Sequence, residues 1–230
     1  MELQFTQLLY LVALYSELPI DKTTFSAQDV LKKRIAPTQS LKISMLNSLI
    51  ECGAILIHTK DNRKVKVLNG TNLTTLKSVT LLNENSNQRF REMLNTLKEF
   101  LDSNDKERLD NLKETIQVHE SIEFIFDKMD SFSNLYDAIN LEPPEEILAI
   151  MAECEPRETL MLLWRACQSM ENHELRLLSA SDDPSDILKA VSQRALNYLQ
   201  GYSSRGASIK KFCRRNYRKS AISTIVFEHL

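Results

Sequence analysis

The chain has 230 residues, 43% of them hydrophobic, with only 4 Gly and 6 Pro; this composition excludes wholesale disorder and a glycine-rich doubly wound nucleotide-binding fold, and it favours a mainly α-helical protein of one or two domains. Its net charge of −2 is unevenly distributed, because residues 1–80 carry 10 Lys and Arg against 6 Asp and Glu, residues 81–186 carry 10 against 24, and residues 187–230 carry 9 against 1. Basic surfaces attract polyanions and acidic helices repel them, so two basic ends around an acidic middle predict a protein that handles nucleic acid or docks to other proteins.

Three helices are predicted in the first third of the chain. Apolar residues at helical spacing predict the first helix, which ends before Pro19. A capping-box-like start at Ser26 opens the second helix, and Pro37 stops it. The third helix runs over residues 38–53, where Gly53 stands at the position of a helix C-cap glycine.

A β-hairpin is predicted after the third helix. Residues 54–58 form its first strand, and residues 64–68, which alternate charged and β-branched side chains, form the returning strand. Three helices followed by a hairpin resemble the winged helix-turn-helix superfamily. The run from Glu51 to Leu56, followed by Asp61 to Lys64, is similar to the junction between recognition helix and wing in MarR-like regulators. The resemblance implies that residues 1–80 form a winged-helix domain.

The resemblance also implies a DNA interface, in which the third helix enters the major groove and the hairpin contacts phosphates. The outer face of that helix offers hydroxyl and amide groups that can bond base edges, but no arginine to bind guanine. Because of this and the acidic Glu51, a winged helix used only for protein contacts remains an alternative. The DNA-binding candidates of this domain are Gln39, Ser40, Lys42, Ser44, Asn47, Ser48, Arg63, Lys64 and Lys66.

The acidic middle, residues 81–140, is predicted to form amphipathic helices. Apolar residues recur at helical spacing between Phe90 and Leu101 and again between Leu109 and Met129, opposite a strongly acidic face. We expect residues 86–130 to form a homodimer or to dock to a protein partner. The alternative is that the same apolar stripes belong to the core of a single chain.

Residues 141–230 are predicted to form a C-terminal helical domain, which starts at the Pro143-Pro144 break and ends in a basic helix over residues 207–220. Six cations share one face of that helix, and such a face can follow a phosphate backbone. The alternatives are that it docks to the acidic middle of the protein itself, residues 81–186, or to an acidic partner surface, or that it is simply solvated. The candidates are Lys210, Lys211, Arg214, Arg215, Arg218 and Lys219.

Neither catalysis nor a cofactor is expected. The histidines and cysteines show no metal-ligand spacing, and there is no phosphate-binding glycine loop or nucleophile elbow. Asp183 or Asp186 with Lys189 could belong to a carboxylate–lysine nuclease centre, but this region is predicted to be loop and helix and lacks the strands that such a centre needs. No apolar run approaches the length of a membrane span, and the unpaired cysteines and the lack of a signal peptide favour the cytoplasm.

Together these features predict a non-catalytic, DNA-binding accessory subunit of a larger bacterial DNA-processing or defence complex. In architecture the chain resembles the winged-helix accessory subunits that bridge SMC-type ATPases. Two alternatives stay open: a winged-helix transcriptional regulator with a dimerising or effector-sensing C-terminal domain, and a small nuclease whose site the sequence does not reveal.

Overall fold

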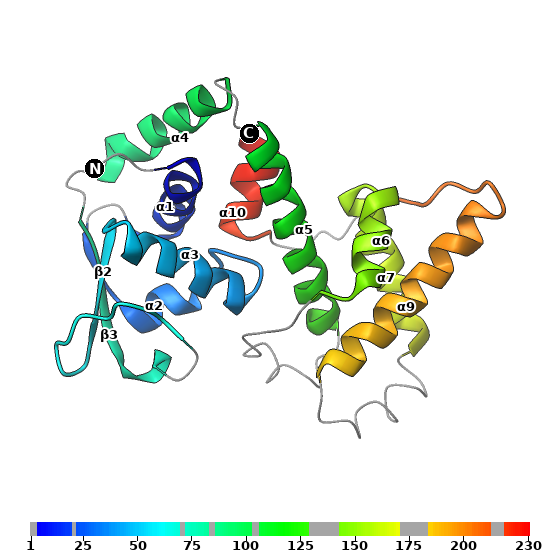
Figure 1. Cartoon of the computed structure of the whole chain (residues 1–230), viewed down its shortest axis with the longest axis horizontal. Helices are drawn as coiled ribbons and strands as arrows, with labels where there is room; N and C mark the ends of the chain where they lie inside the picture. Colours follow the sequence, from blue (N-terminus) through cyan, green and yellow to red (C-terminus); the bar gives the residue numbers. More distant parts are fainter. Residues whose placement is uncertain are drawn as a thin grey trace. The chain divides into compact units, whose positions relative to one another are not determined.

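The computed structural model is mainly helical, as predicted (Figure 1). Its contacts divide the chain into two units: unit 1 comprises Met1–Glu114 with Lys219–Leu230, and unit 2 comprises Thr115–Arg218. These bounds do not coincide with the expected domain limits near residues 80 and 140. The residues that the structure describes are 4–19, 22–69, 72–82, 86–102, 106–128, 143–170, 184–212 and 219–230, with only the backbone described at 86–91, 102, 106 and 184.

Unit 1 is built on helices that cover a small antiparallel sheet. The strand order is β1-β3-β2, so the last strand of the three lies in the centre. Its central strand pairs Val79 with Phe25 on one side and with Ile57 on the other, and all three side chains are buried. In chain order the elements are α1 (Phe5–Glu17), β1 (Thr24–Ser26), α2 (Ala27–Lys32), α3 (Gln39–Glu51), β2 (Ile55–Thr59), a 3-10 turn (Leu73–Thr75) and β3 (Leu76–Leu81).

Both ends of α3 follow local sequence rules. Thr38 caps the first turn, because its side chain accepts a hydrogen bond from the Leu41 amide. Gly53 directly follows the C-cap residue Cys52 with a φ of 71°, and its amide donates to the Ile50 carbonyl. A positive φ is strained for a residue with a Cβ, so the glycine is required here. The prediction of a C-cap at Gly53 is confirmed.

The predicted returning strand at residues 64–68 is wrong. In the structure β2 pairs with β3, and Lys64 makes only an isolated bridge with His58. The difference lies in burial. The strand β3 buries Leu76, Val79 and Leu81 on the face that points to the core. At residues 64–68 charged side chains alternate with valines, and this segment has no apolar face that a sheet would bury. The hairpin therefore has a long loop over residues 60–75, and the sheet has a third strand, β1, that was not predicted.

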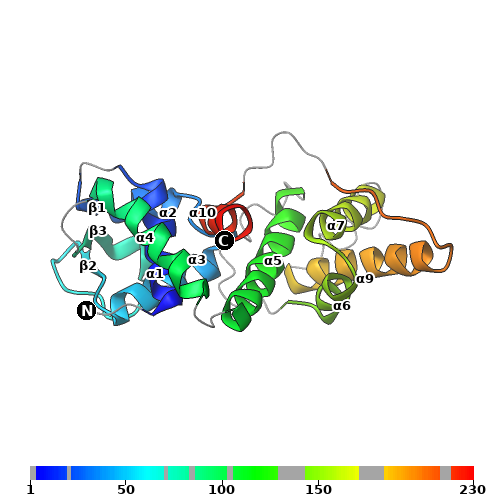
Figure 2. The same cartoon turned by 90° about the horizontal axis from the view of Figure 1, so that it is seen from above.

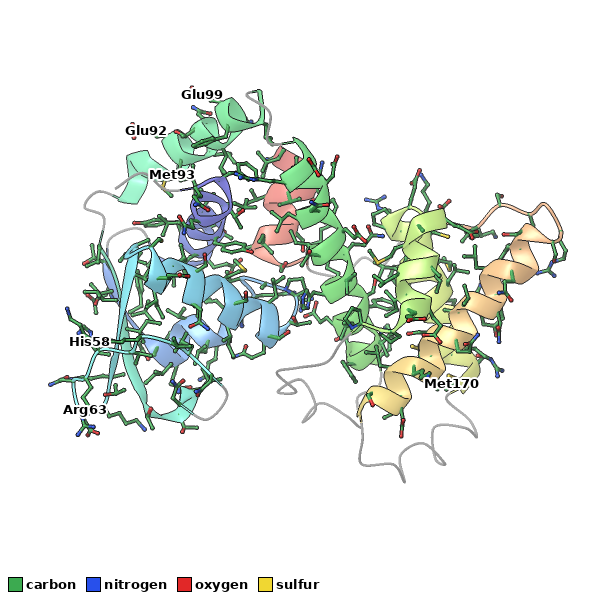
Figure 3. The ribbon with its side chains drawn as sticks, in the orientation of Figure 1. His58, Arg63, Glu92, Met93, Glu99 and Met170 are labelled. Atoms are coloured by element: carbon green, nitrogen blue, oxygen red, sulfur yellow. The ribbon has the colours of Figure 1, made fainter. Side chains whose placement is uncertain are left out.

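The helix α4 (Ser86–Asp102) packs on α1 within unit 1. Leu97 has an exposed fraction of 0%, and the Phe100 ring lies edge-on to Phe5 with centroids 6.4 Å apart. Glu92 and Glu99 point away from α1 (Figure 3). For Leu97 the structure thus supports the intramolecular alternative, because the chain itself already buries this part of the apolar stripe.

The end of the chain belongs to unit 1 and not to the predicted C-terminal domain. The short helix α10 (Ala221–Thr224) and the π-helical turn Ile225–His229 pack beside α1 (Figure 2). The Ala221 and Ile222 amides donate to the carbonyls of Arg34 and Ile35. The segment buries Ile222, Ile225 and Val226 almost completely, so it completes the unit's hydrophobic core.

Unit 2 is a helical cluster. It contains the C-terminal part of α5 (Lys106–Lys128), then α6 (Glu145–Glu153), α7 (Pro156–Met170) and α9 (Pro184–Ser203). α9 packs against both α6 and α7. Met170, at the C-terminal end of α7 (Figure 3), belongs to the same buried apolar cluster as Phe124 and Val191.

The predicted basic helix over residues 207–220 is wrong in its described part, because residues 207–212 and 219–220 are not helical. Gly206 turns the chain with a φ of 59° after α9. The following segment is anchored by Phe212, whose amide donates to the Arg157 carbonyl and whose ring lies 5.2 Å from that of Phe124. Residues 213–218 lie outside the described residues. No helix in the described ranges is long and apolar enough to span a membrane.

Candidate nucleic-acid interface

The β2–β3 loop, residues 60–75, carries the exposed cations of unit 1 that the sequence predicted for phosphate contact. Arg63, Lys64 and Lys66 are all exposed, and Arg63 lies at the outer end of the hairpin (Figure 3). Asn62 turns the chain with a φ of 59°, and its side-chain oxygen accepts a hydrogen bond from Lys77. The structure therefore brings these three predicted residues together in one basic loop.

Asn47 fixes this loop to α3. Its Oδ1 accepts a hydrogen bond of 2.6 Å from the Leu68 amide, and its Nδ2 donates one of 3.0 Å to the Leu68 carbonyl. Leu68 is buried beside it. Asn72 supports the next turn by donating from Nδ2 to the Val67 carbonyl. The predicted base-reading residue Asn47 thus serves a different purpose, because both of its polar atoms are already bonded to the loop backbone.

Lys42 is also displaced from the predicted surface. Only 7% of the residue is exposed, and its Nζ donates a 2.7 Å hydrogen bond to the Leu31 carbonyl in the last turn of α2. A cation at a helix C-terminus interacts favourably with the helix dipole. This contact between α2 and α3 explains why a lysine is tolerated in a buried position, and it removes Lys42 from the set of exposed phosphate contacts.

The remaining predicted residues of α3 form a small polar face. Ser44 is exposed, and Gln39, Ser40 and Ser48 are partly exposed. Ser40 shares a hydrogen bond of 3.1 Å with Thr38. This face can accept and donate hydrogen bonds, but it has no exposed cation.

Val67 was missed as a surface feature. It lies beside Lys66 on the loop and is 62% exposed, the most exposed large apolar residue in the described part of the chain. The alternation at residues 64–68 assigned it to a strand, and a valine in such a pattern gives no sign that it faces solvent. An exposed apolar side chain among cations can contact deoxyribose or wedge against bases.

Two of the C-terminal cations pair with carboxylates of their own units. In unit 2, Lys211 lies 2.6 Å from Glu155, and this carboxylate raises the pKa of Lys211. In unit 1, Lys219 lies 3.0 Å from Glu228. Lys210 is exposed. Arg214, Arg215 and Arg218 lie outside the described residues. For Lys211 the pair with Glu155 favours docking to the acidic middle over phosphate binding, whereas Lys219 pairs with a residue outside that segment.

The described residues contain no group of three or more His, Cys, Asp or Glu that could hold a metal ion. Burial, with Glu158 and Glu153 nearby, raises the pKa of Cys154 to about 11, so this thiol stays protonated near neutral pH and is a poor nucleophile. Burial lowers the pKa of His119. Asp186 and Lys189 lie exposed on α9, and Asp183 lies outside the described residues.

We expect Asn47→Ala to release the loop while leaving the core of unit 1 intact. The variant loses both hydrogen bonds to Leu68, so the Leu68 amide should exchange with solvent at least tenfold faster. Hydrogen-exchange mass spectrometry or NMR measures this. Ser44→Ala, on the exposed face of the same helix, is the matched control. Unchanged exchange at Leu68 in Asn47→Ala would show that the loop is ordered without this contact.

Comparison of the chain with protein-family models, with curated proteins and with solved structures gives no match.

Proposed function

We propose that the protein is a non-catalytic, cytoplasmic DNA-binding accessory subunit of a larger bacterial DNA-processing or defence complex, and that it contacts duplex phosphates through the β2–β3 loop. The observation that carries the proposal is the exposed basic loop formed by Arg63, Lys64 and Lys66, held on α3 by Asn47. In unit 1 the order helix, strand, helix, helix, strand, strand, with strand order β1-β3-β2, supports a winged-helix assignment in which this loop is the wing.

The expected mode of binding is mainly electrostatic. Each cation that neutralises a phosphate releases condensed counterions, which gives affinity without sequence preference. The polar face of α3 adds hydrogen-bond capacity through Ser44 and Ser48, but Lys42 and Asn47 are occupied elsewhere. Contacts to bases are therefore expected to be few, and this suits a subunit that stabilises a larger assembly on DNA better than a sequence-specific regulator.

A second candidate is a protein-contact module. It is favoured by the exposed Glu51 at the end of α3 and by the absence of an exposed cation on the described face of that helix. In this case the same polar face would meet a partner protein, and the basic loop would lie at the edge of the contact.

The test is a charge reversal in the loop. We expect the double variant Arg63→Glu and Lys64→Glu to bind all duplexes at least tenfold more weakly, irrespective of their sequence. The slope of log K against log salt should fall by about two, since each lost phosphate contact removes roughly 0.9 from it. Fluorescence anisotropy at several salt concentrations measures both quantities.

The matched control is the double variant Lys98→Glu and Lys189→Glu, which makes the same change in net charge at exposed positions of α4 and α9. It should retain most of the wild-type affinity. Equal affinity in the wild-type protein and the loop variant, with both folded, would exclude DNA binding by the loop and favour the protein-contact module.

A further inference from the structure

Unit 2 carries a cluster of arginines and tyrosines that no sequence pattern singled out. Arg194, Tyr198, Tyr202 and Arg205 follow one another at intervals of three or four residues, so the first three share one side of α9 and Arg205 follows just past its end. Arg165 on α7 lies against the same side, since it contacts Tyr202. These five residues are called the arginine–tyrosine cluster below.

Tyr202 is at the centre of the cluster. The guanidinium of Arg165 donates a hydrogen bond to its hydroxyl and lies 5.4 Å from its ring centroid. The guanidinium of Arg205 lies 5.7 Å from the same centroid, and its Nε donates a 2.7 Å hydrogen bond to the Gly201 carbonyl. Both guanidinium groups are thus held by a ring and a hydrogen bond. Their fixed positions reduce the entropy that they would lose on binding a ligand.

Two cations of the cluster, Arg165 and Arg205, differ from Lys211 in their surroundings. Neither Arg165 nor Arg205 lies within salt-bridge distance of a carboxylate of the residues that the structure describes, whereas Lys211 pairs with Glu155 in the same unit. A side-chain hydrogen bond with Ser169 lowers the pKa of Tyr198 against the opposing effect of burial, and Arg194 and Arg165 contribute in the same direction. Two like charges held beside one ring, with no described carboxylate next to them, favour an anionic ligand.

We infer that the arginine–tyrosine cluster binds the phosphates of single-stranded nucleic acid. Guanidinium groups present paired donors that match phosphate oxygens. Tyrosine rings and stacked guanidinium planes are surfaces on which unpaired bases stack. From Arg194 to Arg205 the chain covers roughly 16 Å at helical rise, long enough for several nucleotides. This site is separate from the duplex contact proposed for the β2–β3 loop and does not depend on it.

The aromatic side chains of the cluster favour a nucleic acid over an acidic peptide as the ligand. A carboxylate-rich peptide would need only the cations, whereas the half-buried rings of Tyr198 and Tyr202 lie among them and add stacking surface that benefits a base. Stacking accepts any base, so little sequence preference is expected. Binding should depend on salt, since phosphate contacts release counterions.

The test measures binding of a fluorescently labelled oligothymidine strand to the full chain by anisotropy over a range of salt concentrations. The double variant Arg165→Gln and Arg205→Gln should bind about tenfold more weakly or worse, with a salt slope smaller by about 1.4, since each single-strand phosphate contact contributes roughly 0.7. The control Arg157→Gln and Lys189→Gln removes the same charge from exposed positions of α7 and α9 and should bind like the wild-type protein.

Two further variants are measured in the same binding experiment. Arg205→Gln alone changes an exposed side chain, so it should fold normally and still reduce the salt slope by about 0.7. The loop variant Arg63→Glu and Lys64→Glu should retain wild-type binding of the single strand, which separates this site from the duplex contact. Single-strand affinity that is unchanged in folded Arg205→Gln and in the double variant would overturn the inference. A labelled polyglutamate peptide that binds as tightly as the strand would overturn it in favour of an acidic protein ligand.

Discussion

Replacing Leu97 with Asp is expected to unfold unit 1. Leu97 is fully buried where α4 packs on α1, close to the edge-on contact of Phe100 with Phe5. Loss of a buried leucine side chain costs about 2–5 kcal/mol. A carboxylate left in an apolar site without a partner adds several kcal/mol more. The total is comparable with the whole free energy of unfolding of a typical domain, which is about 5–15 kcal/mol.

Circular dichroism during heating, together with light scattering to measure the mass, would check this prediction. Asn95→Asp is the matched control, because it adds the same charge at an exposed position two residues earlier on α4. It should unfold near the wild-type temperature. If the wild-type protein is a dimer and Leu97→Asp is a folded monomer, the apolar stripe forms an interface between chains. This outcome would support the partner-docking hypothesis.

Replacing Ile222 with Asp should have an effect of similar size, although this residue lies more than a hundred positions away from most of unit 1 in the sequence. Its side chain is fully buried, and its amide donates to the Ile35 carbonyl. We expect a loss of more than about 4 kcal/mol, which for a unit of this size lowers the unfolding temperature by more than roughly 10 °C.

His229→Asp is the control for this second prediction, since it adds an acidic residue to the same segment at an exposed position. Hydrogen exchange would localise the effect: amides of α1 should lose protection in Ile222→Asp and keep it in His229→Asp. Full protection of α1 in Ile222→Asp would mean that the C-terminal segment is a peripheral attachment and not part of the core.

Local features of unit 1 could be predicted from the sequence because local rules decide them. Pro19 follows the end of α1 and Gly53 follows the end of α3, where the glycine takes the positive φ that its position requires. The second helix differs, because α2 ends at Lys32, well before the predicted stop at Pro37. The apolar stripe containing Leu97 was recognised as a face to be buried. Periodicity alone, however, does not tell whether the chain or a partner covers that face.

The predictions were wrong where contacts between residues far apart in the sequence determine the structure. The strand β3 forms because Val79 pairs with both Phe25 and Ile57. Neither pairing can be predicted from the residues next to Val79 in the sequence. Lys42 was predicted to be a surface cation because lysine is rarely buried, and its contact with the Leu31 carbonyl depends on how α2 and α3 pack. The helical pattern predicted the wrong structure for residues 207–212, where the turn at Gly206 and the hydrogen bond from Phe212 to the Arg157 carbonyl leave the segment non-helical.

For the candidate interface, the sequence predicted the cations of the loop but not how they are held. Arg63, Lys64 and Lys66 were recognised by charge alone, which is enough for an exposed group. Asn47 was assigned to base contact because its face of the helix points outward. Its actual partner, the backbone of Leu68, is fixed only when the long loop folds back.

The placement of residues 219–230 in unit 1 has a consequence for the order in which the protein can fold during synthesis. All of Thr115–Arg218 is translated between the two parts of unit 1, so the nascent first part must wait for unit 2 before α10 can cover its apolar side. Contacts such as those of Ala221 with Arg34 are highly non-local, and non-local contacts slow folding. Until then the uncovered surface of the nascent chain is exposed to aggregation. Chaperone binding to ribosome-bound chains is therefore expected to persist until residues 219–230 have been synthesised.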